Sequence, residues 1–383
     1  MVVRDLPPLL EGGPGPHARA KAGRSLWQDA FRRLRANRIA LGGGIFLVLM
    51  AIACIVGPSL TGHRYDQVYQ AYVKVPAGLE AHPREADIVP AAENAMRRAR
   101  VDVRAVDVAG SRLTIVVTDD EPVDERIVRY LERSDLFRNA AAGESADGGR
   151  ELTLTAEVDR LRFLFGTDAN GRDLLTRTLF AGRISLAIGL LATFVALAIG
   201  VSYGAAAGYF GGSADLVMMR VVDILYSLPF IFFVILLVVF FGRNFVLMFI
   251  AVGAVEWLDM ARIVRGQTIF LKRQEFVQAA EAMGVDPGGI LKRHIVPNLA
   301  GPVIIYMTLM VPKVILLESF LSFLGLGVQE PMTSWGVLIA EGTRNMQSMP
   351  TMLIFPCIFL VSTLFALNFL GDGLRDALDP KDR

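Results

Sequence analysis

Long apolar segments dominate the pattern of hydrophobic and polar positions along this chain. A helix needs about 20 apolar residues to cross the roughly 30 Å hydrocarbon layer of a membrane. We therefore predict six transmembrane helices, at Ile39–Leu60, Ile184–Tyr209, Leu216–Phe241, Phe245–Val264, Pro302–Leu324 and Thr351–Leu370. Pro229 and Pro312 lie inside two of these segments and should bend their helices, because proline removes a backbone donor.

A glycine stripe marks the second predicted span. Gly200, Gly204 and Gly208 recur every fourth residue and leave one face of the helix nearly flat. Small residues at this spacing let two helices approach closely in lipid. We interpret the stripe as a packing surface rather than a functional site.

A polar stretch at residues 61–160 separates the first span from the rest. Helical periodicity is found at Ile88–Arg100 and Glu121–Phe137, and strand-like alternation at Val101–Val108, Arg112–Thr118 and Glu151–Val158. The run 140–149 is rich in Gly, Ala, Ser and Asp and is predicted to be a flexible loop. The alternation predicts a small inserted α+β domain with a three- or four-stranded sheet.

A second polar stretch, Phe276–Asn298, joins the fourth and fifth spans and is predicted to be two short helices around Gly284. Glycine tolerates the left-handed conformation that ends a helix. Asp286 can then cap a second helix with Pro287 in its first turn. A few residues would suffice to connect two spans. A docking surface for a soluble partner is therefore favoured over a simple solvated loop.

Composition and charge support a membrane protein. Of the 383 residues, 53% are hydrophobic and 20% are charged, below the about 25% typical of soluble domains. The net charge of +1 does not indicate a nucleic-acid partner. Cys54 and Cys357 lie in apolar segments and suggest neither a disulfide nor a metal site.

Basic residues predict the orientation, because they gather on the cytoplasmic side of membrane proteins. Arginines precede the first span, and further Arg and Lys residues occupy the loop at 265–299. We predict a cytoplasmic tail and basic amphipathic helix at 1–38, a first transmembrane helix at 39–60, an extracytoplasmic insertion at 61–160 and a helical core at 161–383. Both termini are then cytoplasmic.

Charged residues inside spans are costly and are functional candidates by default. The acidic ones are Asp223, Glu256, Asp259 and Glu318, with Arg220, Arg262 and Lys313 as candidate partners. Asp259 and Arg262 are three residues apart on one helix and could pair locally. Glu256 and Glu318 lie deeper and are the candidates for lining a transport pathway. An ion-coupled carrier would also use such acids, so that alternative stays open.

No catalytic site is predicted. The four histidines are scattered, and none of the lysines follows a glycine in a phosphate-binding Gly-Lys-Ser/Thr loop. A calcium loop beginning at Asp168 fails, because Arg172 and Leu179 occupy ligand positions. If transport is driven by ATP, the ATPase must therefore be another chain.

Several blocks give the chain a family resemblance. They are Gly166–Leu174, Trp257–Gly266, Phe276–Asn298, Glu318–Gly327 and Asn368–Arg383. With them, the chain resembles the inner-membrane permease subunits of ABC-type oligopeptide/dipeptide importers, specifically the C-type subunit of the oligopeptide permease. The resemblance does not cover residues 61–160. It implies a type I ABC importer permease fold: an all-α polytopic membrane protein of six transmembrane helices, here with the α+β insertion.

The resemblance also assigns the site. The family's coupling motif is Glu-Ala-Ala, three residues, glycine, then a distal hydrophobic-x-Pro. It maps onto Gln278, Ala279, Ala280, Gly284, Ile295 and Pro297. Gln278 departs from the usual glutamate, and Glu281 on the adjacent turn could substitute for it.

The implied assembly is a heterodimer of two permeases in the bacterial inner membrane, with two ATP-binding subunits and an extracytoplasmic peptide-binding protein. ATP and Mg are held by the partner subunits, and this chain binds no cofactor.

Overall fold

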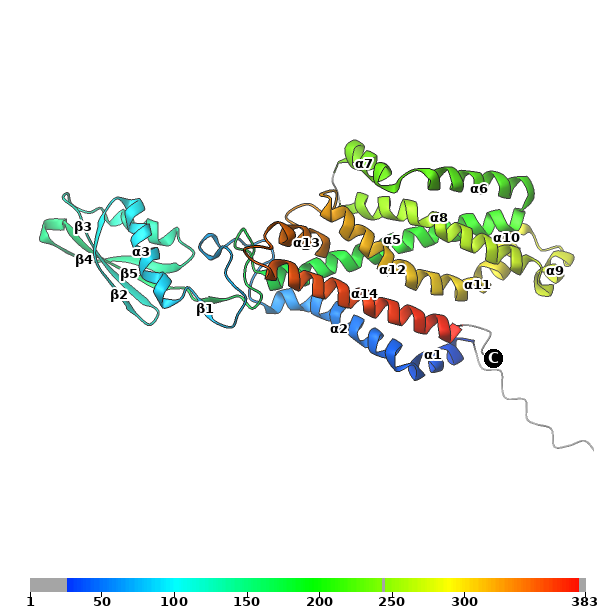
Figure 1. The fold of residues 1–383 in the computed structure, drawn as a ribbon, viewed down its shortest axis with the longest axis horizontal. Helices are drawn as coiled ribbons and strands as arrows, with labels where there is room; N and C mark the ends of the chain where they lie inside the picture. Colours follow the sequence, from blue (N-terminus) through cyan, green and yellow to red (C-terminus); the bar gives the residue numbers. More distant parts are fainter. Residues whose placement is uncertain (1–25, 243–244, 379–383) are drawn as a thin grey trace, which may run out of the picture.

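A computed structural model describes residues 26–242 and 245–378, so residues 1–25 of the predicted tail and basic helix at 1–38 lie outside the described residues. The chain is mostly helical, with a small sheet-containing unit at one end of a bundle of long helices (Figure 1). The long helices are α2 (Arg38–Leu60), α5 (Leu174–Phe210), α8 (Phe245–Lys272), α12 (Ala300–Phe323) and α14 (Thr351–Leu378). Shorter helices complete the bundle: α1 (Leu26–Ala36), α6 (Gly212–Ser227), α7 (Phe230–Phe241) and α13 (Trp335–Arg344).

Four helices among the described residues are long and apolar enough to cross a membrane, namely α2, α5, α12 and α14. The third predicted span is not one helix. It is divided into α6 and α7 at Leu228 and Pro229. Leu228 is extended, with φ −75° and ψ 131°, as expected for a residue that precedes proline. Pro229 therefore breaks the helix instead of bending it, whereas Pro312 lies inside the continuous helix α12.

The glycine stripe of α5 packs against α8, as predicted. A Cβ atom at Gly204 would overlap the Ala261 carbonyl oxygen and the Arg265 backbone nitrogen of α8. Gly200 meets Met260 in the same way, and Gly208 meets Thr268. The absence of side chains on this face lets the two helix backbones approach each other closely.

We expect Gly204→Ala to destabilise the folded protein by about 1–3 kcal/mol, because the added methyl group overpacks the contact between α5 and α8. Gly266→Ala is the matched control, since a Cβ there meets no atom within 4 Å. The control should keep or raise the melting temperature in detergent, because alanine favours a helix over glycine. Equal melting temperatures for the two variants would contradict this account of the stripe.

The sheet unit is a two-layer arrangement of four antiparallel strands and two helices. The strand order is β2 (Asp102–Ala109), β3 (Arg112–Thr118), β5 (Glu151–Val158) and β4 (Phe137–Ala146). Alternate residues of β3 and β5 are buried against α3 (Glu85–Ala99) and α4 (Val128–Glu132). The period of two along each strand produces this one-sided core.

Two local predictions for this unit were wrong. Residues 140–149 are not a loop: they contribute most of β4 and the 3₁₀ turn Asp147–Gly149. The small residues of β4 have weak strand propensity, and pairing with β5 decides their conformation. The predicted helix Glu121–Phe137 is reduced to a 3₁₀ turn at Glu125–Ile127 followed by α4.

A short neck connects the sheet unit to the bundle. β1 (Ala81–His82) pairs with β6 (Leu161–Arg162), and the aromatic rings of Tyr69, Tyr72 and Phe163 pack together beside them. Gly171 has φ +83°, and a Cβ there would overlap the Tyr69 carbonyl oxygen. This glycine therefore allows the neck to lie directly on the loop that precedes α5.

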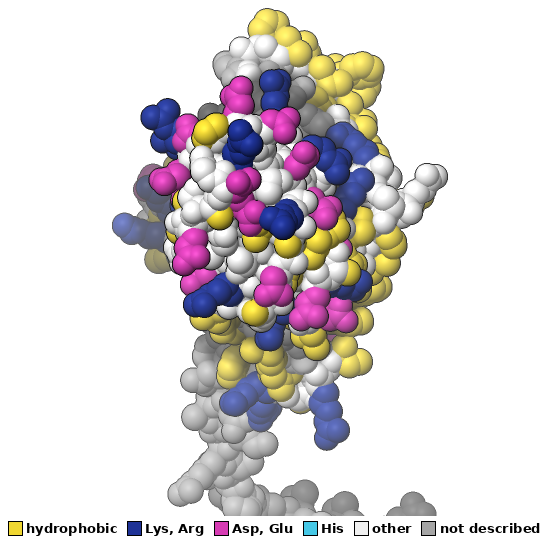
Figure 2. All heavy atoms as spheres, turned by 90° about the vertical axis from the view of Figure 1, so that its left-hand side faces the viewer, with side chains coloured by type: hydrophobic (Ala, Val, Ile, Leu, Met, Phe, Trp, Pro, Cys, Tyr) yellow, Lys and Arg dark blue, Asp and Glu magenta, His cyan; other side chains and the backbone are white. Residues whose placement is uncertain are grey.

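The two ends of the elongated molecule differ in character. Viewed from the sheet end, acidic and basic side chains are interspersed and form no patch of a single sign (Figure 2). At the opposite end, α1, the last turns of α14 and the segment from α9 to α11 lie together (Figure 1).

Candidate functional site

The stretch between α8 and α12 forms the predicted pair of short helices. α9 (Glu275–Ala282) is capped at Met283, and the next residue, Gly284, turns the chain with φ +80°. Asp286 then caps α10 (Pro287–Ile290) by accepting a hydrogen bond from the Gly289 backbone nitrogen at 2.9 Å. Beyond α10 the helical path continues through a π turn (Leu291–Ile295) and α11 (Val296–Asn298). Pro297 therefore lies within α11. We call residues 275–298 the helix pair.

One side of the helix pair is anchored in the bundle. Val277 and Ala280 of α9, and Ile290 and Ile295 after the turn, are buried. They share a core with residues of α5, α8 and α12, including Tyr209, Met260 and Val303. Ala280 and Ile295, two positions of the predicted motif, thus help to hold the helix pair on the ends of the long helices.

The other side of the helix pair is exposed. Gln278, Ala279 and Glu281 lie on the outer side of α9, and Gly284 and Pro297 are also exposed. Two large apolar side chains stand beside them: Met283 is 76% exposed and Phe276 is 42% exposed. We call Phe276, Gln278, Ala279, Glu281 and Met283 the coupling surface.

The two polar side chains of the coupling surface have weak internal partners. Gln278 Nε2 donates to the Arg273 carbonyl oxygen at 3.3 Å, and the Tyr209 hydroxyl donates to Glu281 Oε1 at 3.4 Å. Both residues line a cavity of about 440 Å³ with Lys272 and Asp215. An exposed apolar surface with loosely held polar groups is typical of a docking site for another protein.

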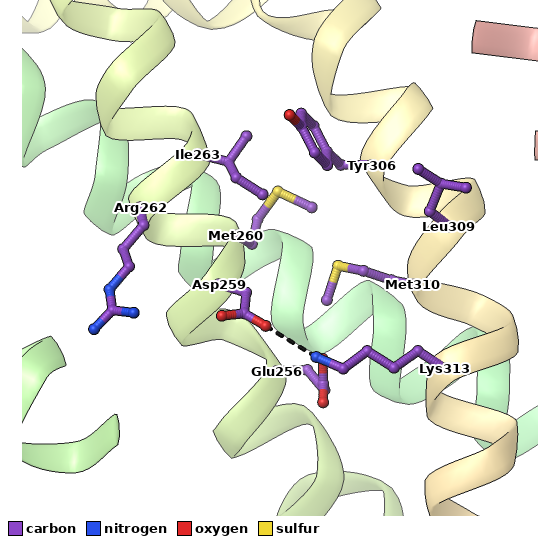
Figure 3. A pocket seen from close by; sticks show the side chains of 9 residues that line it. All are labelled: Glu256, Asp259, Met260, Arg262, Ile263, Tyr306, Leu309, Met310 and Lys313. Atoms are coloured by element: carbon purple, nitrogen blue, oxygen red, sulfur yellow. Dashed lines mark hydrogen bonds and ion pairs between the residues drawn. The ribbon is translucent and has the colours of Figure 1, made fainter. Parts of the chain in front are cut away.

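A second cavity lies between α8 and α12 and contains Glu256 (Figure 3). Glu256 is 5% exposed, and its Oε2 lies 2.8 Å from Lys313 Nζ. Lys313 Nζ also donates to Asp259 Oδ2 at 2.9 Å. The predicted local pair of Asp259 with Arg262 is wrong. Arg262 instead donates to Asp223 Oδ1 of α6 at 2.9 Å and stacks on the Tyr226 ring.

Glu318, the other pathway candidate, is fully buried between α5 and α13. Its carboxylate accepts hydrogen bonds from Ser185 Oγ at 3.1 Å and Ser322 Oγ at 2.7 Å. The Ser334 hydroxyl lies 3.3 Å from Ser322 Oγ, and the Ser334 side chain caps α13. In this structure Glu318 organises the junction of three helices.

Sequence reasoning missed an ion cluster near the neck, in which Asp168, Arg172 and Arg177 are buried and Glu330 and Glu341 lie at its edge. Asp168 Oδ2 accepts from Arg172 Nε at 2.7 Å and also pairs with Arg177. Arg177 donates to both carboxylate oxygens of Glu341, at 2.7 and 3.1 Å, and Arg172 donates to Glu330 at 2.9 Å.

The cluster fixes the loop before α5 to α13. Asp173 next to it caps α5 by accepting from the Thr176 backbone nitrogen at 2.7 Å, and burial raises the pKa of the Asp173 carboxyl. The cluster could not be read from local spacing, because Arg177 and Glu341 are 164 residues apart.

Comparisons with known families identify two regions. The family "Binding-protein-dependent transport system inner membrane component" matches residues 198–383. The family "N-terminal TM domain of oligopeptide transport permease C" matches residues 25–77. Residues 78–197, which include the sheet unit, lie between the two matched ranges.

Similar curated proteins agree with these matches. The oligopeptide transport system permease protein OppC of Escherichia coli (strain K12) is 44% identical over 361 residues, which cover 94% of this chain and 93% of that protein. OppC of Haemophilus influenzae is 59% identical over 219 residues, 57% of this chain and 70% of that protein. The dipeptide transport system permease protein DppC of Bacillus subtilis is 47% identical over 220 residues, 57% of this chain and 69% of that protein.

Proposed function

The chain belongs to the family of binding-protein-dependent transport system inner membrane components, and on this premise we propose that it is a permease subunit of an ATP-driven importer for peptides. It forms half of the translocation pathway and couples to separate ATPase subunits through the helix pair. The observation that carries the proposal is the coupling surface, which is exposed at the end of the bundle opposite the sheet unit. The family match favours this function over an ion-coupled peptide carrier.

The proposed partners are a second, homologous permease, two ATP-binding subunits and an extracytoplasmic peptide-binding protein. ATP and Mg are bound by the ATP-binding subunits, and this chain needs no cofactor. When those subunits close on ATP, they push on the coupling surface. Because Val277, Ala280, Ile290 and Ile295 anchor the helix pair in the bundle, a movement of the pair is transmitted to α5, α8 and α12. This movement switches the pathway between inward-facing and outward-facing states.

The proposed placement in the bacterial inner membrane has six crossings. α6 with α7 and α8 supply the two crossings beyond the four long apolar helices. The helix pair, α1 and the end of α14 share one end of the bundle, which supports cytoplasmic termini (Figure 1). The sheet unit at the other end is then extracytoplasmic. Glu256 lines the pathway, and Glu318 supports its wall.

Co-purification tests the docking claim. We expect two ATP-binding subunits to co-purify with the wild-type permease pair, and Met283→Asp to reduce the amount retained about tenfold or more, because a charge replaces an exposed apolar contact. Leu79→Asp is the matched control, since Leu79 is 79% exposed and precedes β1 in the neck, away from the helix pair. Equal retention by both variants would contradict docking at the coupling surface.

A further inference from the structure

The cavity between α8 and α12 has a mixed charged and apolar wall (Figure 3). Its volume is about 340 Å³, near the lower end of the about 300–1,000 Å³ of small-molecule sites. Glu256, Asp259 and Lys313 meet on one side, as Figure 3 shows, and Met260, Met310 and Tyr306 line the rest of the wall toward Leu309. The space suits one end of a chain-like ligand rather than a whole oligopeptide.

The charges on this wall do not balance. Lys313 Nζ is shared between Glu256 Oε2 at 2.8 Å and Asp259 Oδ2 at 2.9 Å. Arg262 also borders the cavity, but its charge is compensated by Asp223. Two carboxylates and one ammonium therefore leave one negative charge in excess. Glu256 is nearly fully buried, whereas the side chain of Asp259 is 36% exposed, so the excess charge lies where the cavity is open to a ligand. A charge left uncompensated inside a membrane protein is costly.

The apolar part of the cavity wall can adapt its shape to a ligand. Methionine side chains are flexible and polarisable, and binding surfaces that accept varied ligands use them for this reason. Met260 and Met310, with the Tyr306 ring, could pack against apolar side chains of different shapes. The wall thus favours a ligand with a positive charge at one end and accepts apolar groups of different shapes beside it.

We propose that this cavity binds the α-ammonium group of the transported peptide at the carboxylates of Glu256 and Asp259, next to Lys313 Nζ, with the first side chain against Met260 and Met310. The inference rests on the proposed function as a peptide importer. It adds that this chain recognises the amino terminus of the peptide. A free amino terminus is common to peptides of every sequence, and it supplies the missing positive charge. The site therefore recognises peptides without selecting their sequence.

The test uses the complete permease and ATPase complex in lipid nanodiscs, without the binding protein, so that only the membrane site is measured. Binding of trialanine and of N-acetyl-trialanine is titrated by saturation-transfer NMR, which suits weak ligands. We expect trialanine to bind about tenfold or more tightly than the acetylated peptide, because acetylation removes the charge. Glu256→Gln and Asp259→Asn should each weaken trialanine binding and leave the acetylated peptide unchanged.

Two further variants separate this electrostatic role from a structural one. Lys313→Gln breaks the same ion pairs but removes the competing ammonium, so it should bind trialanine at least as tightly as wild type. Asp66→Asn is the matched control, in the segment between α2 and β1, and should leave the affinity for both peptides unchanged. Equal affinity of the wild type for both peptides would overturn the inference, and so would equal weakening by Glu256→Gln and Lys313→Gln. Uptake is measured separately, in proteoliposomes that hold the complete complex with the binding protein and ATP. If these take up trialanine but the nanodisc complex gives either result, only this inference fails; if they take up no peptide, the proposed function fails.

Discussion

Replacing Gly284 with valine should separate ATP hydrolysis from peptide uptake. Gly284 has φ +80°, a conformation that costs a non-glycine residue roughly 1–2 kcal/mol, and a β-branched side chain is especially poorly suited to it. A Cβ at this position meets no atom within 4 Å, so the substitution strains the backbone without a steric clash. The turn should shift and displace α10 from α9. We expect uptake to fall about tenfold or more, with the protein still assembled and ATP still hydrolysed.

Gly284→Asn is the matched control for this prediction. Asparagine adds a side chain of similar size but adopts the left-handed conformation more readily than other non-glycine residues. The control should retain most of the uptake, and the number of ATP molecules hydrolysed per peptide should rise only in the valine variant. If both variants transport as the wild type does, the conformation of the turn has no part in coupling.

Arg177→Gln should produce the largest loss of stability. The Arg177 guanidinium is almost fully buried and pairs with Asp168 and Glu341. Removing one partner of a buried ion pair leaves charges uncompensated and typically costs about 3–5 kcal/mol. We expect a lower melting temperature in detergent and less folded protein in the membrane.

Arg172→Gln serves as the comparison for Arg177→Gln. One of its partners, Glu330, has a side chain that is 62% exposed and can be solvated by water, so this variant should be less affected. A loss at position 172 equal to or greater than that at position 177 would show that burial does not set the stability of the cluster.

Features governed by neighbouring residues could be predicted from the sequence. The turn at Gly284, the cap at Asp286 and the packing of the glycine stripe follow from local backbone preferences and spacing, and the structure contains all three. The strands β2 and β3 were also predicted, because their residues alternate and a Gly110 turn joins them.

Features governed by distant residues could not be predicted in this way. β4 is a strand because β5 pairs with it, although its own sequence is typical of a loop. Lys313 of α12 neutralises part of the charge of Glu256 and Asp259, which lie on α8. Lys313 and Asp259 are 54 residues apart in the chain. The same holds for Arg177 and Glu341. Lys313 was among the candidate partners of the acidic residues, but spacing on one helix favoured Arg262 as the partner of Asp259, because local spacing does not show pairing across helices.

The central claim is that this chain moves peptides with energy that enters from separate ATPase subunits. Uptake of a labelled peptide into proteoliposomes tests it most directly, comparing the complete complex with the permease pair alone. We expect uptake only when the ATPase subunits, ATP and the binding protein are all present, and none under a proton gradient without them. Peptide accumulation by the permease pair alone, driven by a proton gradient, would contradict it.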